Sequence, residues 1–302
     1  MNSALAYRLM LIVSALLFST GGTAMKATPF NGWQVASMRS AIAAVMLILL
    51  LPRGRRFWKP RVLAIGALQA ATMILFALAN KLTTGANAIF LHYTAPLHML
   101  WIGPWLLKER PRRADFVFMA AVVGGVCLLL AGQGPPLATA PRPVAGNVLA
   151  VLSGLTWAMT IAGLRWHAHG AEASGSDDAG ACIIAGNVIA ALVCLPFALP
   201  IPAGGASAWA PVVFLGVFQV ALAYFLLTRG VSRVGALEAS LILFLEPVGS
   251  AAWAWLIHGE RLTFVALMGG LVMLVAIAGH SLWRMRDHGA AAVIYPDPPP
   301  GT

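Results

Sequence analysis

The sequence has few charged residues. Asp, Glu, Lys and Arg make up 10% of the 302 residues, whereas a typical soluble domain contains about 25%. Hydrophobic residues make up 60%, and the mean hydropathy is +0.82. This small polar surface is insufficient to cover a globule in water. The composition therefore indicates an integral membrane protein and excludes a soluble enzyme or a soluble binding domain.

Acidic residues and cysteines are also scarce. There are 10 acidic residues against 20 basic ones, an excess that indicates nucleic-acid binding only where it gathers on one face of a domain. Here the basic residues stand in short groups between apolar runs, so no nucleic-acid partner is expected. The three cysteines, Cys127, Cys182 and Cys194, all fall inside apolar runs. They indicate neither a disulfide framework nor a zinc site.

Motifs of hydrolases and of ATP-driven pumps are absent. The sequence contains no H-E-x-x-H, no G-x-S-x-G and no Walker motif, the short patterns that mark metalloproteases, serine hydrolases and nucleotide-binding loops. Acidic residues inside apolar runs reduce essentially to Glu246 and, near the end of a run, Glu238. One buried carboxylate is a poor basis for hydrolysis. We therefore expect no enzyme activity, no cofactor and no metal centre.

Long apolar runs are abundant. Crossing about 30 Å of hydrocarbon takes about 20 helical residues, and runs of about that length recur with short polar breaks. We predict an all-α integral membrane protein with ten transmembrane helices. The predicted spans are residues 7–25, 33–51, 61–80, 86–107, 114–132, 146–165, 180–199, 211–229, 235–257 and 263–283. The first run lacks the cleavage pattern of a signal peptide and is interpreted as an uncleaved helix.

The distribution of lysine and arginine predicts the orientation of these helices. If the amino terminus is cytoplasmic, fifteen of the 20 basic residues lie on the cytoplasmic side, and Lys26, Lys81, Arg142 and Arg261 lie on the other side. Arg39 lies within a helix. Loops on the cytoplasmic side of a membrane carry an excess of positive charge. Both termini are therefore expected in the cytoplasm.

One pattern occurs twice, 151 residues apart. The matched pairs are Pro96 and Pro247, Glu109 and Glu260, Arg110 and Arg261, Trp58 and Trp209, and Pro60 and Pro211. The repeat unit contains five helices, and because five is odd, the second copy enters the membrane from the opposite side. We therefore predict an inverted repeat, an arrangement that is found in many secondary transporters and that encloses a site near mid-depth of the membrane. Chance coincidence of the matched residues is the alternative.

The repeat predicts the division of the chain into four segments. Residues 1–132 form a first five-helix repeat, and residues 133–145 form a periplasmic linker. Residues 146–284 form the second, inverted repeat. Residues 285–302 are rich in proline and are expected to form a disordered cytoplasmic tail.

These features carry a family resemblance. The five-plus-five layout, "KER" at Lys108–Arg110, "GER" at Gly259–Arg261 and "LEP" at Leu245–Pro247 resemble the drug/metabolite transporter superfamily, in its EamA-domain branch. The resemblance covers about residues 7–284. Within that branch the chain is most similar to the YddG-type amino-acid exporters of bacterial inner membranes.

The resemblance implies a basket-like bundle of ten helices that exports small metabolites, aromatic amino acids included, without ATP hydrolysis. The first repeat departs from the family's Glu-Pro pattern, because it has Ala95-Pro96. From the resemblance and the inverted repeat we expect a secondary transporter in the bacterial inner membrane that exports amino acids and related small molecules by alternating access. Export of other metabolites or drugs, and a channel-like facilitator, are the alternatives. Proton-coupled and uncoupled transport are both compatible with these residues.

Two charged residues are predicted at membrane depth. Arg39 is about the seventh residue of the second span, and Glu246 is about the twelfth of the ninth. A charge at a helix centre costs about 2.5–3.5 kcal/mol on the insertion scale, so it should face protein or a water-filled cavity. The two are expected either to neutralise each other or to bind opposite ends of a zwitterionic substrate. Alternatively, Arg39 snorkels to the surface and Glu246 binds a neighbouring hydroxyl.

Pro96 and Pro247 predict matched irregularities in the fourth and ninth helices. Proline lacks an N–H and pushes away the carbonyl four residues back, here those of His92 and Leu243. The freed carbonyl is expected to allow bending for gating or to accept a ligand proton. Such irregular backbone is tolerated in a membrane only against protein or a wet cavity. A permanent kink without a gating role is the alternative.

The fourth span carries the most candidate binding residues. Tyr93 and Trp101 are eight residues apart and share a helix face, so they are expected to form an aromatic wall, with His92 and Pro96 beside them. The other predicted cavity-lining residues are Trp157, Gln219, Tyr224, Glu246 and Ser250. Aromatic residues in membrane proteins often pack or mark the interface instead. Packing is therefore the alternative for each.

Small and hydroxylated residues cluster in "STGGT", from Ser19 to Thr23. Small residues let helices approach closely and slide, which predicts a gating role for Ser19, Gly21 and Gly22. Plain close packing is the alternative. The Glu-Arg pairs at 109–110 and 260–261 are expected to cap the fourth and ninth helices and not to bind substrate.

Overall fold

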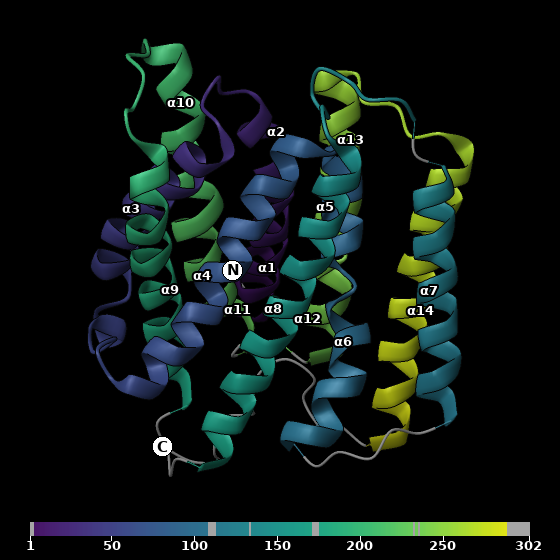
Figure 1. Cartoon of the computed structure of the whole chain (residues 1–302). Coiled ribbons are helices and arrows are strands. Elements are labelled where there is room, and N and C mark those ends of the chain that lie inside the picture. Colours follow the sequence, from purple (N-terminus) through teal and green to yellow (C-terminus); the bar gives the residue numbers. More distant parts are fainter. Residues whose placement is uncertain are drawn as a thin grey trace.

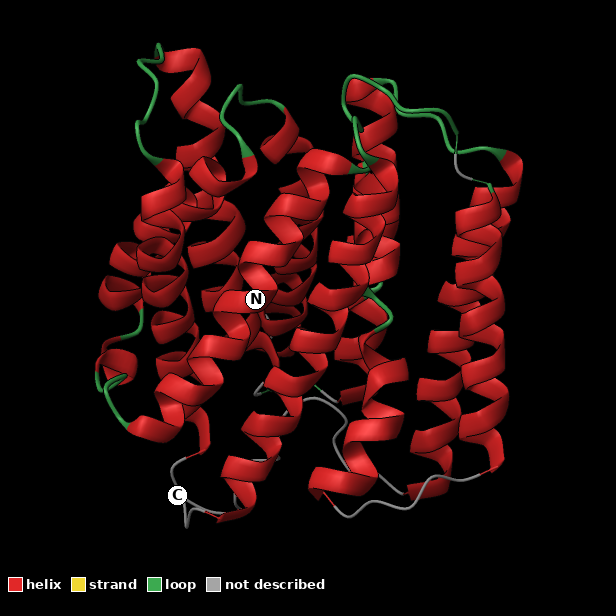
Figure 2. Ribbon diagram, viewed as in Figure 1, coloured by secondary structure: helices red, strands yellow, loops and turns green. Residues whose placement is uncertain are grey.

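The chain folds into a helical bundle (Figure 1). The computed structural model describes residues 3–107, 113–132, 134–170, 175–231, 233–234 and 236–288. Within these ranges there is no β-strand (Figure 2). Leu137 and Ala140 form an isolated bridge. Glu109 and Arg110, which the sequence pattern predicts to cap a helix, lie outside the described residues.

The helices alternate with short connections along the chain. In the first half they are α1 (Ser3–Ser19), α2 (Gly21–Lys26), α3 (Gly32–Leu50), η1 (Pro52–Arg55), α4 (Pro60–Leu82), α5 (Gly85–His92), α6 (Ala95–Ile102), η2 (Gly103–Leu107) and α7 (Arg113–Ala131). In the second half they are α8 (Pro143–Gly170), α9 (Gly175–Ala198), α10 (Ala206–Phe214), η3 (Leu215–Leu222), α11 (Ala223–Val231), α12 (Ala236–Leu243), α13 (Leu245–His258) and α14 (Phe264–His288). The short η1 is a 3₁₀ helix, and η2 and η3 are π-helices.

Every predicted span coincides with helical structure. Among the described residues, seven helices are long and apolar enough to cross a membrane, namely Leu5–Lys26, Gly32–Leu50, Pro60–Leu82, Pro143–Trp166, Ala179–Ala198, Ala206–Val231 and Leu241–His258. Asp115–Ala131 and Phe264–His280 are shorter apolar helices. The fourth predicted span is in neither group because it is divided into α5, α6 and η2. The chain is thus an all-helical, multi-pass membrane protein, and the number of ten crossings stays a prediction.

Local sequence signals set several helix ends. The Asn31 side chain accepts a hydrogen bond from the Gln34 backbone N–H at 3.0 Å, and the Gln34 side chain accepts one from the Asn31 N–H at 3.0 Å. This reciprocal capping box satisfies two backbone donors at the start of α3. Gly259 ends α13 in the left-handed region, at φ +66°, which costs glycine little because it has no Cβ.

Two helices are interrupted at equivalent points of the 151-residue repeat. The first ends at His92 and resumes at Ala95, and the second ends at Leu243 and resumes at Leu245. His92 and Leu243 are themselves 151 residues apart. Each of them is four residues before a matched proline, whose ring displaces the carbonyl at that distance. The prolines therefore sit in the first turn of α6 and α13, not within a continuous kinked helix.

The two interrupted helices run antiparallel. Gly85, at the start of α5, donates its N–H to Glu260 Oε2 just beyond the end of α13, at 2.7 Å. Midway along, the Tyr93 hydroxyl lies 3.3 Å from the Leu243 carbonyl oxygen. The start of one helix thus lies at the end of the other. This is the relation that an odd-numbered repeat requires of its equivalent helices.

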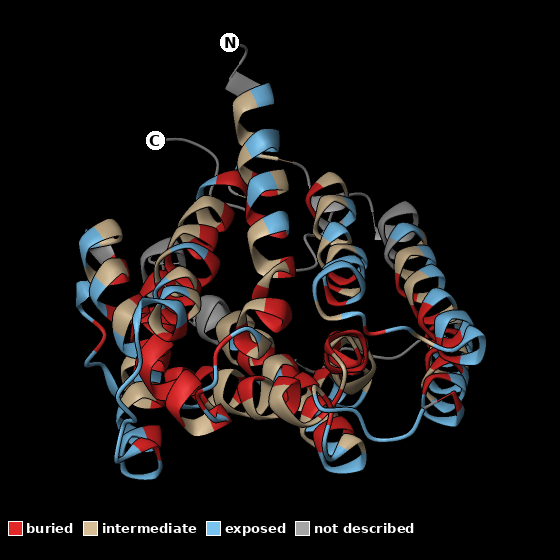
Figure 3. Ribbon diagram, turned by 90° about the horizontal axis from the view of Figure 1, so that it is seen from above, coloured by how far each residue is buried: buried red, intermediate tan, exposed pale blue. Residues whose placement is uncertain are grey.

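Large hydrophobic side chains cover the outside of the bundle. Phe264 is 77% exposed and Val117 is 73% exposed. Figure 3, viewed from above, shows buried residues toward the inside and exposed ones around the rim. An apolar outer surface on so many helices fits contact with lipid, where backbone polar groups must be satisfied within the helices. Helices α7 and α14, which carry these two residues, pack together at one edge of the bundle (Figure 1).

The carboxyl-terminal helix is longer than predicted. It continues to His288, whereas the sequence pattern predicts a disordered tail from residue 285. Residues 289–302, which include most of that tail, lie outside the described residues.

Candidate functional site

The two helix interruptions meet in the middle of the bundle. Tyr93 lies between two eight-residue helices, α5 and α6, and so at the midpoint of the rod they form. Its hydroxyl oxygen lies 3.0 Å from Glu246 Oε2 and 3.3 Å from the Leu243 carbonyl oxygen. Tyr93, Glu246 and Leu243 are each half-buried. We define this group, together with His92 and Trp157, as the central site.

At each helix break, the carbonyl group four residues before the proline lies close to another helix. Because Pro247 has no N–H, the Leu243 carbonyl has no donor four residues later, and the Tyr93 hydroxyl, which is closer to Glu246, lies 3.3 Å from it. On the other interruption, Gly154 of α8 packs against the backbone of His92. A methyl group at position 154 would lie 2.7 Å from the His92 carbonyl oxygen and 2.9 Å from Thr94 Oγ1. The absence of a side chain at Gly154 therefore lets α8 lie directly against the break.

His92 connects the interruption to α8. Its Nδ1 lies 2.9 Å from Ser153 Oγ, and that hydroxyl already donates its one proton to the Ala150 carbonyl at 2.7 Å. Ser153 therefore accepts from His92, which places the proton of the neutral imidazole on Nδ1. Nε2 is left as a hydrogen-bond acceptor.

Aromatic rings surround this imidazole. The centroid of the His92 ring lies 5.1 Å from that of Phe76, 6.3 Å from that of Tyr93 and 6.4 Å from that of Trp157. These separations lie within or near the range of favourable ring contacts. The central site therefore combines one carboxylate with an aromatic wall contributed by α4, the α5–α6 break and α8.

The small residues of the first helix lie against both halves of the chain. A methyl group at Gly21 would lie 2.9 Å from Gln219 Nε2, and one at Gly22 would lie 2.6 Å from Asn80 Oδ1. Ser19 Oγ accepts a hydrogen bond from Trp253 Nε1 at 3.1 Å. The structure thus shows close packing at "STGGT", which is the alternative to gating. Its gating role stays a proposal.

Trp101 and Tyr224, two of the predicted site residues, lie away from the central site, whereas Ser250 is close to Glu246. Trp101, on α6, is 69% exposed, and the break at Tyr93 removes the continuous helix face that the two were expected to share. Tyr224 is buried in an apolar cluster, where its hydroxyl accepts from Gln69 Nε2 at 3.0 Å and its ring meets Phe18 edge-on at 5.0 Å. Ser250 is buried, at 3% exposure, one turn beyond Glu246.

Arg39 neither pairs with Glu246 nor reaches the surface. Its side chain is 1% exposed and donates to the Met73 carbonyl oxygen at 2.8 Å. Its Nε has no hydrogen-bond partner. Within the described residues, no acidic side chain lies at ion-pair distance from it. The expectations of pairing and of snorkelling are therefore replaced by a buried cation held by a backbone carbonyl, and a contact of Arg39 with substrate stays a prediction.

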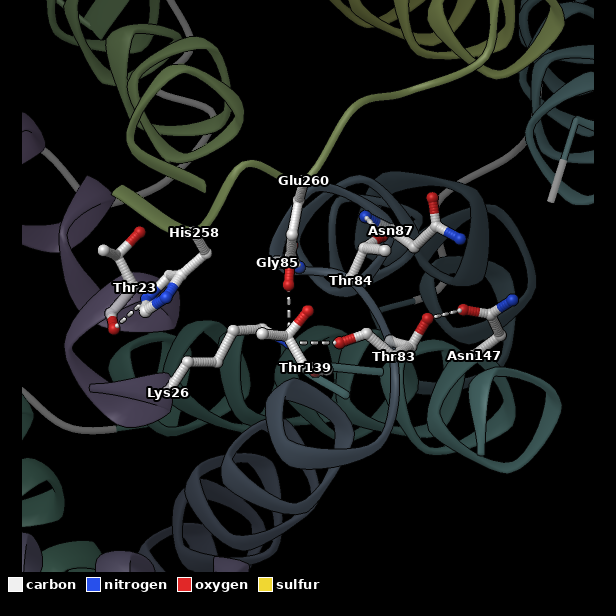
Figure 4. A network of polar contacts seen from close by, with 10 residues as sticks. All are labelled: Thr23, Lys26, Thr83, Thr84, Gly85, Asn87, Thr139, Asn147, His258 and Glu260. Carbon is white, nitrogen blue, oxygen red and sulfur yellow. Dashed lines mark hydrogen bonds and ion pairs between the residues drawn. The ribbon is translucent and has the colours of Figure 1, made fainter. Parts of the chain in front are cut away.

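A polar network at one end of the bundle was not predicted as a unit (Figure 4). Lys26 Nζ and Glu260 Oε1 lie 3.0 Å apart, and each side chain is 2% exposed. Glu260 caps α5 through Gly85 N–H, so it is a helix cap as expected, but for the start of the fourth helix and not for the end of its own.

A second acidic pair was overlooked. Asp115, the second residue of the fifth predicted span, is 1% exposed, and its Oδ1 lies 2.6 Å from His280 Nε2. The His280 ring stacks on Phe118 with centroids 4.2 Å apart. The pair joins α7 to α14 far along the chain. Because Asp115 lies at the start of a predicted span, the sequence pattern did not indicate that its carboxylate is buried.

Comparisons with known proteins match most of the chain. A model of the EamA-like transporter family matches residues 5–131 and again residues 144–282. A curated protein of Bacillus subtilis (strain 168), "Uncharacterized transporter YdfC", is 39% identical over 66 residues, which is 22% of this chain and 22% of the relative. The match therefore spans less than a quarter of that relative.

A solved structure is similar over nearly the full length. Described only as "Crystal structure of protein", it matches with a TM-score of 0.61 and 21% identity, covering 93% of this chain and 98% of that one. At this identity the likeness concerns the fold alone.

Proposed function

Because the chain belongs to the EamA-like transporter family, we propose that it is a secondary carrier that exports amino acids, aromatic ones included, and related small metabolites by alternating access. The observation that carries this proposal is the meeting of the two repeat-related helix breaks at Tyr93 and Glu246. In inverted-repeat carriers, interrupted helices form the site near the bilayer midplane. The antiparallel course of α5–α6 and α12–α13 supports the same arrangement here.

The residues at the break suit an amino acid. Glu246 Oε2 accepts from Tyr93, and Oε1 makes no hydrogen bond among the described residues, so it is available to a substrate ammonium group. An ammonium–carboxylate contact is a strong, charge-assisted hydrogen bond. His92 Nε2 offers a second acceptor. The rings of Phe76, His92 and Trp157 form a surface on which a flat side chain packs.

The symmetry of the two breaks supports alternating access. Each repeat contributes one helix that is divided at mid-depth, and each division leaves a hinge of one or two residues. Hinges of a few element-terminal residues are the usual way in which bundles close around a ligand. The two halves of each rod can then tilt while the central site stays in place. The positive-charge bias supports an orientation with both termini in the cytoplasm of a bacterial inner membrane.

Transport in liposomes tests this function. Purified protein is reconstituted, the vesicles are loaded with radiolabelled phenylalanine, and efflux is measured with and without a pH gradient. The proposal expects saturable efflux that other amino acids inhibit and that Glu246→Gln reduces. Efflux that stays linear in concentration would identify a channel. Saturable efflux of other metabolites, with none of amino acids, would keep the carrier and replace its substrate class.

A further inference from the structure

The first predicted span (α1 and α2) and the ninth (α12 and α13) form a continuous seam between the two halves of the chain; they are called helix one and helix nine below. Four contacts define this seam: Arg8 with Glu238, Ser19 with Trp253, Thr23 with His258, and Lys26 with Glu260. The two partners of each contact are 230 to 235 residues apart. Because this offset hardly changes, the helices run parallel and touch along their full length. Ion pairs lie at both ends: the bases are Arg8 on α1 and Lys26 on α2, and the acids are Glu238 on α12 and Glu260 just beyond the end of α13.

The two ion pairs differ in burial. At the end that holds the amino terminus, the side chains of Arg8 and Glu238 are 50% and 41% exposed. At the opposite end, those of Lys26 and Glu260 are each 2% exposed. An exposed ion pair contributes little to stability, whereas removing one member of a buried pair leaves an uncompensated charge. Breaking the ion pair therefore costs more free energy at the Lys26 end of the seam than at the Arg8 end.

Lys26 joins four segments at its end of the bundle (Figure 4). Its ammonium group donates to the Thr83 carbonyl at 2.7 Å and to the Thr139 carbonyl, and it forms an ion pair with Glu260. Thr83 precedes α5, and Thr139 belongs to the connection between the repeats. Glu260, in turn, accepts from Gly85 N–H, at the positive end of the α5 dipole.

The seam is tightly packed between its two ends. A methyl group at Gly249 would lie 2.8 Å from Ser19 Oγ and 2.9 Å from Ser19 Cβ. Gly249 is 11 residues from Glu238 and 11 residues from Glu260. A contact of small residues lets two helices tilt about it without separating. Tilting about this contact in one direction would separate the two helices at one end of the seam, while they stay together at the other end.

From this geometry we propose that Lys26 and Glu260 form the gate on their side of the membrane, closed in the present structure, and that Ser19 and Gly249 form its pivot. The proposal rests on alternating access, which requires each side to open in turn. Opening this side breaks the Lys26–Glu260 pair and uncaps α5. Both residues are positioning residues, since they act on helix one and helix nine and do not touch the central site.

Labelling of a buried cysteine tests the gate without any substrate. The background variant has Cys127, Cys182 and Cys194 replaced by alanine, and it carries Ser250→Cys, which is 3% exposed and one turn from Glu246. A membrane-impermeant maleimide is added on the Lys26 side. Glu260→Gln retains the acceptor for Gly85 N–H and removes the charge. We expect it to raise the labelling rate at least about tenfold, a shift of one factor of ten in the open population.

Two further variants make the result specific. Lys26→Met also removes the hydrogen bonds to the Thr83 and Thr139 carbonyls, so it should raise labelling at least as much as Glu260→Gln. The double variant should raise it no further than Lys26→Met, because both changes break the same ion pair. Arg8→Gln, at the exposed end, should leave labelling from the Lys26 side unchanged. Unchanged labelling in monodisperse Glu260→Gln and Lys26→Met protein would overturn the gate, as would fully additive effects. Because labelling needs no flux, failure of amino-acid transport in liposomes would leave this result interpretable by itself.

Discussion

The Tyr93 hydroxyl lies 3.0 Å from Glu246 Oε2, across 153 residues of sequence. Tyr93 stands at the break of the fourth helix, and Glu246 stands two residues beyond Phe244, the equivalent break of the ninth. The first repeat has alanine where the second has Glu246. A symmetric scaffold therefore carries an asymmetric site, in which one repeat supplies a carboxylate and the other supplies the hydroxyl that binds it.

Tyr93→Phe should weaken transport by acting on Glu246. The change removes one hydroxyl and keeps the ring, so the carboxylate loses a donor. Hydrogen bonds to charged groups contribute about 1.5–3 kcal/mol, which predicts a fall in kcat/KM of about 10- to 100-fold, measured as efflux from liposomes. Tyr224→Phe is the matched control, because its hydroxyl binds Gln69 in the apolar core. Equal losses in both variants would contradict a specific role of Tyr93.

Trp157→Ala and Trp101→Ala should have different effects on transport, because Trp157 lies at the central site and Trp101 lies on the outer surface. The Trp157 ring lies 6.4 Å from that of His92, so its removal should raise KM for aromatic amino acids more than for alanine. Trp101 is 69% exposed, so its removal should leave both values near wild type. The helix spacing alone predicts a loss of transport for Trp101→Ala. Competition assays with phenylalanine and alanine in the same vesicles distinguish the two expectations.

The helices and their matched breaks follow from the sequence because they depend on local features. Apolar length predicts each span, and Pro96 and Pro247 mark the two interruptions within a few residues. The pairing of Tyr93 with Glu246 was not predictable, because helix spacing assumes a continuous helix and the break changes which residues share a face. The ion pair of Lys26 and Glu260 depends on tertiary packing between segments 234 residues apart, which no local pattern contains.

Gly154→Ala should destabilise the protein through the backbone of His92. The added methyl group would lie 2.7 Å from the carbonyl oxygen of His92, and overpacking of this kind costs about 1–3 kcal/mol. We expect a lower midpoint of thermal unfolding in detergent. Gly124→Ala, in α7, is the control, because its methyl group would meet no atom within 4 Å. A midpoint that falls equally in both variants would show that helix position, not the contact with His92, matters.

Arg39→Met should leave the protein as stable as the wild type or make it more stable. The buried guanidinium has one backbone acceptor, the Met73 carbonyl at 2.8 Å, and its Nε has no partner. Losing a typical hydrogen bond costs about 0.5–1.5 kcal/mol, whereas removing a poorly compensated buried charge relieves a desolvation cost of several kcal/mol. The second effect is larger, so the midpoint of thermal unfolding should stay level or rise. Arg39→Lys keeps the charge on a more strongly hydrated group and should lower the midpoint. If the methionine variant is the less stable of the two, an anionic partner holds Arg39 in the folded protein, and the assignment of an isolated cation is wrong.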